Sequence, residues 1–412
     1  MAEGKDAMER RGSNLPRVGD YNQLLVLDLI RRHGTISRVE LSERTGLSGQ
    51  TVSNICRRLV ASGLIEPAGR EEADTGARRT MFRIVAQGQY SVGLHIDPAR
   101  MSLVLLNLAG EVEDRISVIT PATDGPDDVL TAVADAVDAL ALRRHIPRHR
   151  LAGLGVSTPG PILADTVVEP PNLRGWGVVR LRAELESRTG LPVILEKDTI
   201  AAATGELWAS GGALTDFAFI YLGTGIGAGV VLGGEVLRGS SDNLGEIGHL
   251  SGDPDGPLCY CGGRGCIAIT CAPVHLVGEA AERGLLPAVP PDDHLAVETA
   301  LARLGSLADG GDLAARSIVE KSARSIGRIA GKLANVLDLD TIILGGPNWP
   351  VLSGTYLRVV PSIPASLLTV SDVHSVTVRG TTMSEDGGAV GAASLVMSSM
   401  VSARSDRLVL PR

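Results

Sequence analysis

The residues best suited to chemistry are three cysteines and a histidine that lie close together in the chain. Cys259, Cys261 and Cys266 fall in the run LCYCGGRGCIAIT, and His249 precedes the first of them by ten residues. Three thiolates and an imidazole suit a tetrahedral Zn²⁺ ion, and soft thiolate ligands favour zinc over Mg²⁺. A redox pair of thiols and buried apolar cysteines are the other two interpretations, although the CxxC spacing common in redox pairs is absent.

Two glycine-rich stretches could bring backbone N–H groups close to a phosphate. The first is GTGIGAG, residues 223–229, and the second is Gly345–Gly346 at the end of an apolar run. Without a Cβ, successive N–H groups can converge on an anion. A tight hairpin explains the first stretch equally well, and the end of a buried strand explains the second.

The first ninety residues carry the pattern of a helix-turn-helix. An apolar helix is expected over Asn22–Gly34. Ser37 can then cap a short second helix with Glu40 as its capping-box partner, Gly46 supplies a tight turn, and Ser48 caps a third helix that extends to about residue 62. The residues of the third helix expected to face inward are Val52, Ile55, Leu59 and Val60.

The opposite face of the third helix predicts contact with DNA. After this helix, a short strand, a charged loop and a second strand over Thr80–Val85 read as a β-hairpin wing. Residues 1–90 hold fourteen Lys and Arg against eleven Asp and Glu, so this segment is basic while the whole chain has a net charge of −8. The side chains expected to reach base edges or phosphates are Ser48, Gln50, Thr51, Asn54, Arg57, Arg58, Arg78 and Arg79.

The remainder of the chain alternates strands and helices, which indicates an α/β architecture. Strands are expected in YSVGLHI, MSLVLLN, EDRISVIT, RLAGLGVST, LPVILEKDT, FAFIYL, GAGVVLGGEV and TIILGG, and helices near 127–145 and 313–337. At 412 residues, the chain should form two or three domains. No apolar run approaches the length of a membrane span, and residues 1–15 are polar, so we expect no membrane contact and a cytoplasmic location.

The order of these motifs resembles the ROK family, which groups sugar kinases with transcriptional repressors. The resemblance spans nearly the whole chain, in the runs SRVELSERTGLSGQTVS, STPGPI, PNLRGW, EKDTIAAATGE, GTGIGAGVVLGGEVLRGSSDNLGEIGH, CYCGGRGC and IILGGP. It implies a two-lobed, actin-like (ribonuclease H-like) sugar-kinase fold. A winged helix-turn-helix ahead of that fold is the layout of the repressor branch.

The resemblance also implies roles for individual residues. His249, Cys259, Cys261 and Cys266 would hold one structural zinc ion, with His249 also facing the sugar pocket. Cys56 and Cys271 would be buried packing residues. The ligand-binding positions carried over from the family are Asn172, Lys197, Asp198, Glu246 and His249. In the kinases, the position of Asp198 is the general base on the attacking hydroxyl.

The chain departs from the kinase pattern at several of these positions. Lys197 replaces an asparagine, and Ala268 replaces a sugar-binding glutamate. The phosphate-binding turn D-x-G-x-T reads Asp97–Met101 here, without its glycine or threonine and with Pro98 in place of an N–H donor. We therefore expect no catalytic residue, a vestigial base at Asp198, and a vestigial nucleotide loop at Gly223, Thr224, Gly225 and Gly227.

Lys197 supports two hypotheses. Its ammonium could favour a phosphorylated or acidic sugar. Alternatively, it could form an internal ion pair with Asp198 that fills the pocket.

These observations predict a sugar-responsive transcriptional regulator, most simply a repressor of carbohydrate-related genes. Its partners would be double-stranded DNA with an inverted-repeat operator, a sugar or sugar derivative, and a second copy in a dimer, or further copies in a tetramer. The alternatives are a bifunctional sugar kinase with a DNA-binding head, and a DNA-binding scaffold that answers to a protein partner. We expect a winged helix-turn-helix over 1–88, a smaller lobe over 89–200 completed by a helix at 386–403, and a larger lobe over 201–385 with the zinc knuckle and dimerisation surface.

Overall fold

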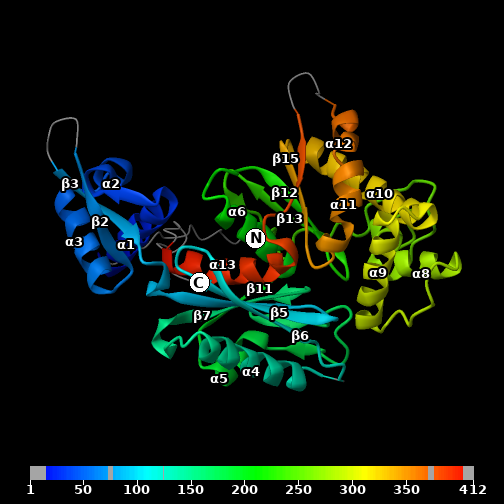
Figure 1. The fold of residues 1–412 in the computed structure, drawn as a ribbon, viewed down its shortest axis with the longest axis horizontal. Helices are drawn as coiled ribbons and strands as arrows, with labels where there is room; N and C mark the ends of the chain where they lie inside the picture. The colour runs from blue at the N-terminus through cyan, green and yellow to red at the C-terminus, as the bar shows by residue number, and fades with distance from the viewer. Residues whose placement is uncertain (1–14, 73–77, 124, 370–374, 402–412) are drawn as a thin grey trace, which may run out of the picture. The chain divides into compact units, whose positions relative to one another are not determined.

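The structure, a computed structural model, describes residues 15–72, 78–123, 125–369 and 375–401. The chain divides into two compact units (Figure 1). The first unit contains the chain up to Gly88 together with the residues from Met397 onward, and the second unit is Gln89–Val396. No described helix is long and apolar enough to cross a membrane.

The first unit is a winged helix-turn-helix. Its three helices precede a small antiparallel sheet of order β1-β3-β2. The elements are α1 (Leu15–His33), β1 (Thr35–Ser37), α2 (Arg38–Thr45), α3 (Gly49–Ala61), β2 (Ile65–Glu72) and β3 (Arg78–Ile84). The predicted β-hairpin wing is present as the antiparallel strands β2 and β3, and β3 starts two residues before the expected Thr80.

Side-chain caps fix the helix boundaries of this unit. The Ser37 hydroxyl accepts a hydrogen bond from the Glu40 N–H, and the Glu40 carboxylate accepts one from the Ser37 N–H, which completes the predicted capping box. Gly46 ends α2 in the left-handed conformation at φ 68°, which glycine adopts without steric cost. The Ser48 hydroxyl then accepts the Thr51 N–H at the start of α3.

One predicted core residue of α3 is wrong. Val60 is 39% exposed, whereas Cys56 takes the fourth buried position beside Val52, Ile55 and Leu59. Residues 52, 55, 56 and 59 follow the i, i+3, i+4, i+7 spacing of one helix face, and Val60 lies beyond its edge.

The second unit contains two five-stranded sheets, shown by the cyan-to-green and green-to-orange parts of Figure 1. The first has the order β11-β7-β4-β5-β6 and the second the order β14-β13-β12-β15-β16. The strands of the first sheet are β4 (Tyr90–Ile96), β5 (Arg100–Asn107), β6 (Val112–Ile119), β7 (Leu151–Thr158) and β11 (Val193–Lys197). Those of the second are β12 (Phe217–Leu222), β13 (Ile226–Leu232), β14 (Glu235–Val236), β15 (Thr341–Gly345) and β16 (Thr377–Gly380).

The two sheets share one topology. In each, three antiparallel strands come first, and two further strands then join in parallel beside the first of the three. No repeat is visible in the sequence.

Helices cover both sheets. The helices are α4 (Asp127–Arg143), α5 (Leu181–Thr189), α6 (Asp198–Ala209), α7 (Ile267–Thr270), α8 (Pro273–Glu282), α9 (His294–Asp309), α10 (Leu313–Leu337), α11 (Trp349–Val359), α12 (Ser362–Leu367) and α13 (Gly387–Val401). A small sheet of β8 (Ile162–Leu163), β9 (Thr166–Val168) and β10 (Val178–Val179) lies between β7 and α5 in the chain. The long helix α10 has the bounds that the sequence predicts.

The first sheet is packed on both faces. Helices α4 and α5 bury Val133, Leu140 and Leu185 against one face, and α13 lies on the other (Figure 1). A Cβ on Gly93 or Gly155 would come within 2 Å of an α13 carbonyl, so glycine is required for this close approach. The C-terminal helix thus completes the lobe built by residues 90–197.

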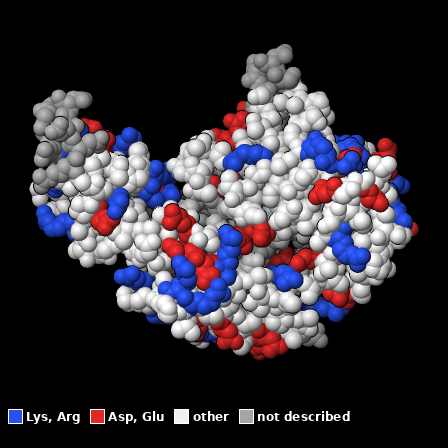
Figure 2. All heavy atoms as spheres, viewed as in Figure 1, with Lys and Arg blue, Asp and Glu red and all other residues white. Residues whose placement is uncertain are grey.

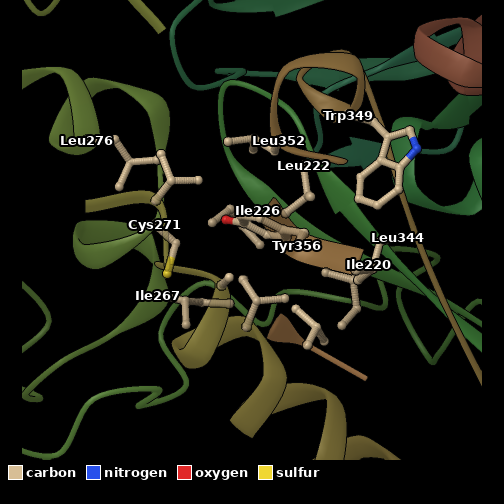
Figure 3. Close-up of a cluster of buried hydrophobic side chains, with 14 of the residues drawn as sticks. Ile220, Leu222, Ile226, Ile267, Cys271, Leu276, Leu344, Trp349, Leu352 and Tyr356 are labelled. Carbon is tan, nitrogen blue, oxygen red and sulfur yellow. The ribbon is translucent and has the colours of Figure 1, made fainter. Parts of the chain in front are cut away.

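The second sheet has its own apolar core, shown in Figure 3. Ile220, Leu344 and Tyr356 lie in this core, and the Tyr356 hydroxyl is 2.7 Å from the Ser322 hydroxyl. Cys271 is buried in the same cluster (Figure 3), so its thiol belongs to the core.

Candidate functional site

The predicted metal ligands converge in the structure. The ligand atoms of His249, Cys259, Cys261 and Cys266 all lie within 4.8 Å of one another. Cys259 Sγ is 3.5 Å from His249 Nδ1, and Cys261 Sγ is 3.6 Å from Cys266 Sγ. The second separation is too long for a disulfide bond, which is about 2.05 Å. It is close to the roughly 3.8 Å expected between two sulfurs that bind one zinc ion at 2.3 Å each.

Backbone turns bring these ligands together. Cys259 N–H donates to the Gly263 carbonyl at 2.7 Å, and Gly262 adopts φ 89° in the turn between them. Gly265 has φ 61°, and a Cβ there would lie 1.5 Å from the Asp253 carbonyl oxygen. The glycines are therefore needed to fold the three thiols onto the histidine. The geometry and the donor set both fit a tetrahedral zinc ion.

A cavity opens where the parallel strands of the first sheet end. Strands β4, β7 and β11 are parallel neighbours, so their carboxyl ends meet at one edge, where ligands of such sheets usually bind. The cavity has a volume of about 110 Å³. Its lining includes the predicted ligand residues Asn172, Lys197, Asp198 and Glu246. His249 is not among the lining residues, and its Nδ1 faces the metal cluster. Contact between its other ring nitrogen and a ligand stays a prediction.

Lys197 is paired with Glu246 rather than with Asp198. Its Nζ lies 2.5 Å from Glu246 Oε1 and 3.3 Å from the carbonyl oxygens of Asn243 and Leu244. The internal ion pair that the sequence suggested therefore exists with a different partner. The reason is that Lys197 ends β11 whereas Asp198 begins α6, and the two neighbouring side chains diverge.

A second ion pair lies beside the first, and it also joins a buried side chain to a more exposed one. Arg238 donates to the carboxylate of Glu196, whose side chain is 5% exposed. Burial raises the pKa of Glu196, and the nearby Arg238 opposes that rise. The pair joins the end of β11 to the segment after β14. Arg238 is a site residue that the sequence did not single out, because its partner lies 42 positions away.

Asp198 is held in an environment that favours its protonated form. Burial raises its pKa to about 7, and Glu246 and Asp97 add to the rise, while Lys197 and the Thr199 N–H oppose it. Its carboxylate accepts the Thr199 N–H at 2.7 Å. A carboxyl group that titrates near neutral pH is suited to proton transfer with a bound hydroxyl.

Replacing Asp198 with asparagine should flatten the pH dependence of stability. The folded-state pKa of about 7 lies above the ordinary 3.8, so the folded chain keeps a proton that the unfolded chain loses between these values. The free energy of unfolding should therefore fall as the pH rises through this window, by at most about 1.4 kcal/mol per pH unit. Urea unfolding of both proteins between pH 5.5 and 7.5 measures this slope. Parallel pH profiles for the two proteins would contradict the assignment.

The glycine-rich stretch over 223–229 forms a hairpin turn. Strands β12 and β13 pair on either side, and the Gly223 N–H donates to the Gly225 carbonyl at 3.0 Å. A Cβ on Gly227 would clash with Thr199, so this glycine is needed for the packing of α6 on β13. Thr224, Gly225 and Gly227 also line the cavity, so the hairpin turn forms part of its wall, and its role as a vestigial nucleotide loop stays a prediction.

The turn after β4 is occupied by its own side chains. Asp97 accepts the Ala99 N–H at 3.0 Å and the Thr224 hydroxyl at 3.0 and 3.2 Å.

A larger cavity of about 390 Å³ adjoins this turn, and Asn172 lines both cavities. Arg100 and Glu298 form an ion pair of 2.8 Å in its wall, between β5 and α9. A buried hydrogen bond near this cavity joins Tyr221 OH and His95 Nε2 at 2.8 Å. Burial raises the pKa of Tyr221 and lowers the pKa of His95.

The outer face of α3 carries the predicted DNA contacts. Ser48, Gln50, Asn54, Arg57 and Arg58 are exposed, and Thr51 is half-buried. The Asn54 side-chain oxygen accepts hydrogen bonds from Gln50 at 3.4 Å and Arg57 at 3.3 Å. These three polar side chains therefore form one row along α3, the recognition ridge.

The wing residues are only partly described. Arg79 is half-buried in β3. The side chain of Arg78 and residues 73–77 of the wing loop lie outside the described part of the chain.

The second unit lacks such a ridge on the face that Figure 2 shows. There, the basic side chains, which include one larger group, lie beside acidic side chains. The basic run over 143–150 is paired, since Arg143, Arg144 and Arg148 each contact a carboxylate within 3 Å. The first unit therefore carries the better candidate for a polyanion surface.

Comparison with known proteins agrees with this division. Residues 91–399 match the ROK family, and residues 14–79 match the MarR family. A proposed xylose repressor of Caldicellulosiruptor sp. (strain Rt8B.4) is 27% identical over 391 residues, which cover 93% of this chain and 97% of that protein. A glucokinase of Halalkalibacterium halodurans is 34% identical over 268 residues, or 63% of this chain and 80% of the enzyme.

Solved structures show the same fold. A ROK family transcriptional regulator, a homologue of the Escherichia coli MLC protein, aligns with 94% of this chain and 98% of its own at a TM-score of 0.73 and 22% identity. A ROK family glucokinase from Streptomyces griseus, in complex with glucose and AMPPNP, aligns with 74% of this chain and 98% of its own at a TM-score of 0.62 and 25% identity. The chain belongs to the ROK family and carries a MarR-type winged helix ahead of the family's two-lobed, sugar-kinase-like fold.

Proposed function

We propose that the protein is a sequence-specific transcriptional regulator, most simply a repressor, that responds to a sugar or sugar derivative in the cleft of its second unit. The observation that carries this proposal is the recognition ridge, which is exposed on α3 of a helix-turn-helix whose helices have side-chain caps. The similarity to a proposed xylose repressor over 97% of that protein supports it, because the match includes both units. A DNA-binding regulator of this kind would act in the cytoplasm.

The assembly that fits this role is a homodimer that reads an inverted repeat, with a tetramer as the alternative. Two-fold symmetric proteins match two-fold symmetric operators, and half-site spacing then follows the spacing of the two α3 helices. Ligand binding in the cleft would change the relative stability of two arrangements of the lobes and so the fit to DNA.

We propose that the cleft has no useful kinase activity. Asp97 accepts the Ala99 N–H, so the N–H that could bind a phosphate in this turn is already used, and Pro98 has none. Lys197 and Glu246 neutralise each other inside the cavity. Phosphoryl transfer depends on preorganised donors for the transferred group, and this region offers few.

A bifunctional sugar kinase is the second candidate. It is favoured by Asp198, a carboxyl group with a pKa of about 7 at the edge of the sheet, and by the similarity to glucokinase and N-acetylmannosamine kinase sequences. A coupled ATP-turnover assay with glucose and N-acetylmannosamine decides between the two. We expect turnover no higher in the wild type than in Asp198→Asn. Turnover that the substitution abolishes would establish the kinase.

The metal cluster would hold one zinc ion with a structural role. His249, Cys259, Cys261 and Cys266 would be its four ligands, which leaves no open position for a substrate. Bound zinc would supply a rigid crosslink between the loop that carries Glu246 and the turn before α7. The ion would therefore orient a cavity residue without contacting the ligand.

A further inference from the structure

The cleft holds one cation that is almost completely buried. The Lys197 side chain is 4% exposed, and its Nζ contacts two carbonyl oxygens and one carboxylate, that of Glu246. The carbonyl groups orient the ammonium but carry no formal charge. Glu246 is therefore the group that neutralises this ammonium.

The two partners of this ion pair differ greatly in exposure. The Glu246 side chain is 77% exposed, whereas that of Lys197 is buried. The Glu246 carboxylate can turn into water at little cost. Lys197 cannot follow it, because β11 holds it at the end of the sheet. A buried ammonium without an anion is costly, so any ligand that displaces Glu246 must bring a replacement.

We infer that the ligand of the cleft is a sugar acid, a sugar that carries a carboxylate, which takes the place of the Glu246 carboxylate on Lys197 Nζ. This inference rests on the proposed function, because it names the class of ligand to which the regulator responds. Neutral sugars offer hydroxyl groups, and these cannot neutralise the ammonium once Glu246 is displaced. Asn172 and Asp198, which line the same cavity, remain available to the ligand's hydroxyl groups.

A carboxylate fits this site better than a phosphate. The position is held by a single carboxylate in the structure, and Lys197 is the one cation among the described residues that line the cavity. Asp97, Asp198 and Glu246 line it as well, so the surroundings carry negative charge. A dianion would meet more repulsion there than a monoanion.

Binding of a sugar acid should also depend on pH. The charged and titratable groups around Asp198 are Lys197, Glu246, Asp97 and Tyr221. Glu246 stays close to the cavity after the ligand carboxylate has taken its place, so Asp198 has one more negative charge near it than in the free protein, and this charge disfavours its ionised form. Protonation of Asp198 should therefore accompany binding, and the affinity should fall as the pH rises through about 7.

Calorimetric titration of the full chain at pH 6.5 tests the inference. The probes are D-glucuronate, D-galacturonate, D-mannuronate and L-iduronate, with the matching neutral hexoses and glucose 6-phosphate. At least one hexuronate should bind ten times or more tightly than its neutral hexose. Lys197→Gln should weaken that binding at least tenfold, whereas Glu246→Gln, which removes the competing charge, should strengthen it. Thermal unfolding of both variants checks that they are folded.

The two substitutions have opposite expected effects, so a general loss of structure cannot imitate the result. Equal affinity for a hexose and its uronate would overturn the inference, as would weaker uronate binding by Glu246→Gln. Binding of glucose 6-phosphate without binding of any hexuronate would also overturn the inference, because the ligand would then be a sugar phosphate. No binding by any probe, with operator binding intact, would overturn the inference and leave the DNA-binding function standing. Uronate binding without operator binding would instead contradict the proposed function.

Discussion

Replacing Asn54 and Arg57 together with alanine should weaken operator binding by at least about thirtyfold. Both side chains are exposed on α3, and the Arg57 guanidinium donates to Asn54, so the two belong to the recognition ridge. A well-placed base contact contributes about 1–3 kcal/mol, and the loss of two gives this factor at the low end. Fluorescence anisotropy measures the dissociation constant on a duplex that the wild type selects from random DNA.

Arg32→Ala is the matched control for this double substitution. It removes one positive charge from the same unit, at the end of α1, where Arg32 pairs with Asp28 at 2.7 Å. The control should change the affinity by less than about threefold, since one exposed charge contributes little. Equal losses in the control and the double variant would show that net charge, and not the ridge, determines binding.

Replacing Cys261 with serine should remove the metal and destabilise the second unit. The Cys261 side chain is exposed, so the substitution changes little apart from the ligand. Binding of a structural zinc ion contributes directly to folding free energy, and its loss should lower the melting temperature by roughly 5–10 °C. Elemental analysis should find about one zinc ion per wild-type chain and close to none in the variant.

Cys271→Ala provides the control for the metal prediction. Cys271 is a buried residue of the apolar core, so its substitution should cost stability through packing while the zinc content stays unchanged. A wild-type protein without zinc, or a Cys261→Ser variant that retains it, would contradict the assignment of the cluster.

The features that the sequence predicted best are those that neighbouring residues determine. The Ser37–Glu40 capping box, the Gly46 turn and the Ser48 cap each involve residues within five positions of one another, and all are present. The metal cluster spans only residues 249–266 and carries unusual residue types, so its members could also be identified. Apolar runs indicated eight of the ten strands in the two sheets, whereas the short strands β14 and β16 were not predicted.

The partners of the charged cleft residues could not be predicted in this way. Lys197 pairs with Glu246 and Glu196 with Arg238, across 49 and 42 positions. These pairs depend on how β11 meets the segment after β14, which no local pattern encodes. Val60 was predicted to face inward but is exposed, because helical periodicity alone does not show where the packing surface of a helix ends.

The central claim is that this ROK protein reads a DNA sequence. Operator titration of the full chain, at one fixed salt concentration, tests it most directly. The protein should bind the selected duplex, which should contain an inverted repeat, at least about a thousandfold more tightly than a scrambled duplex of equal length. Equal affinity for the two duplexes would contradict the account.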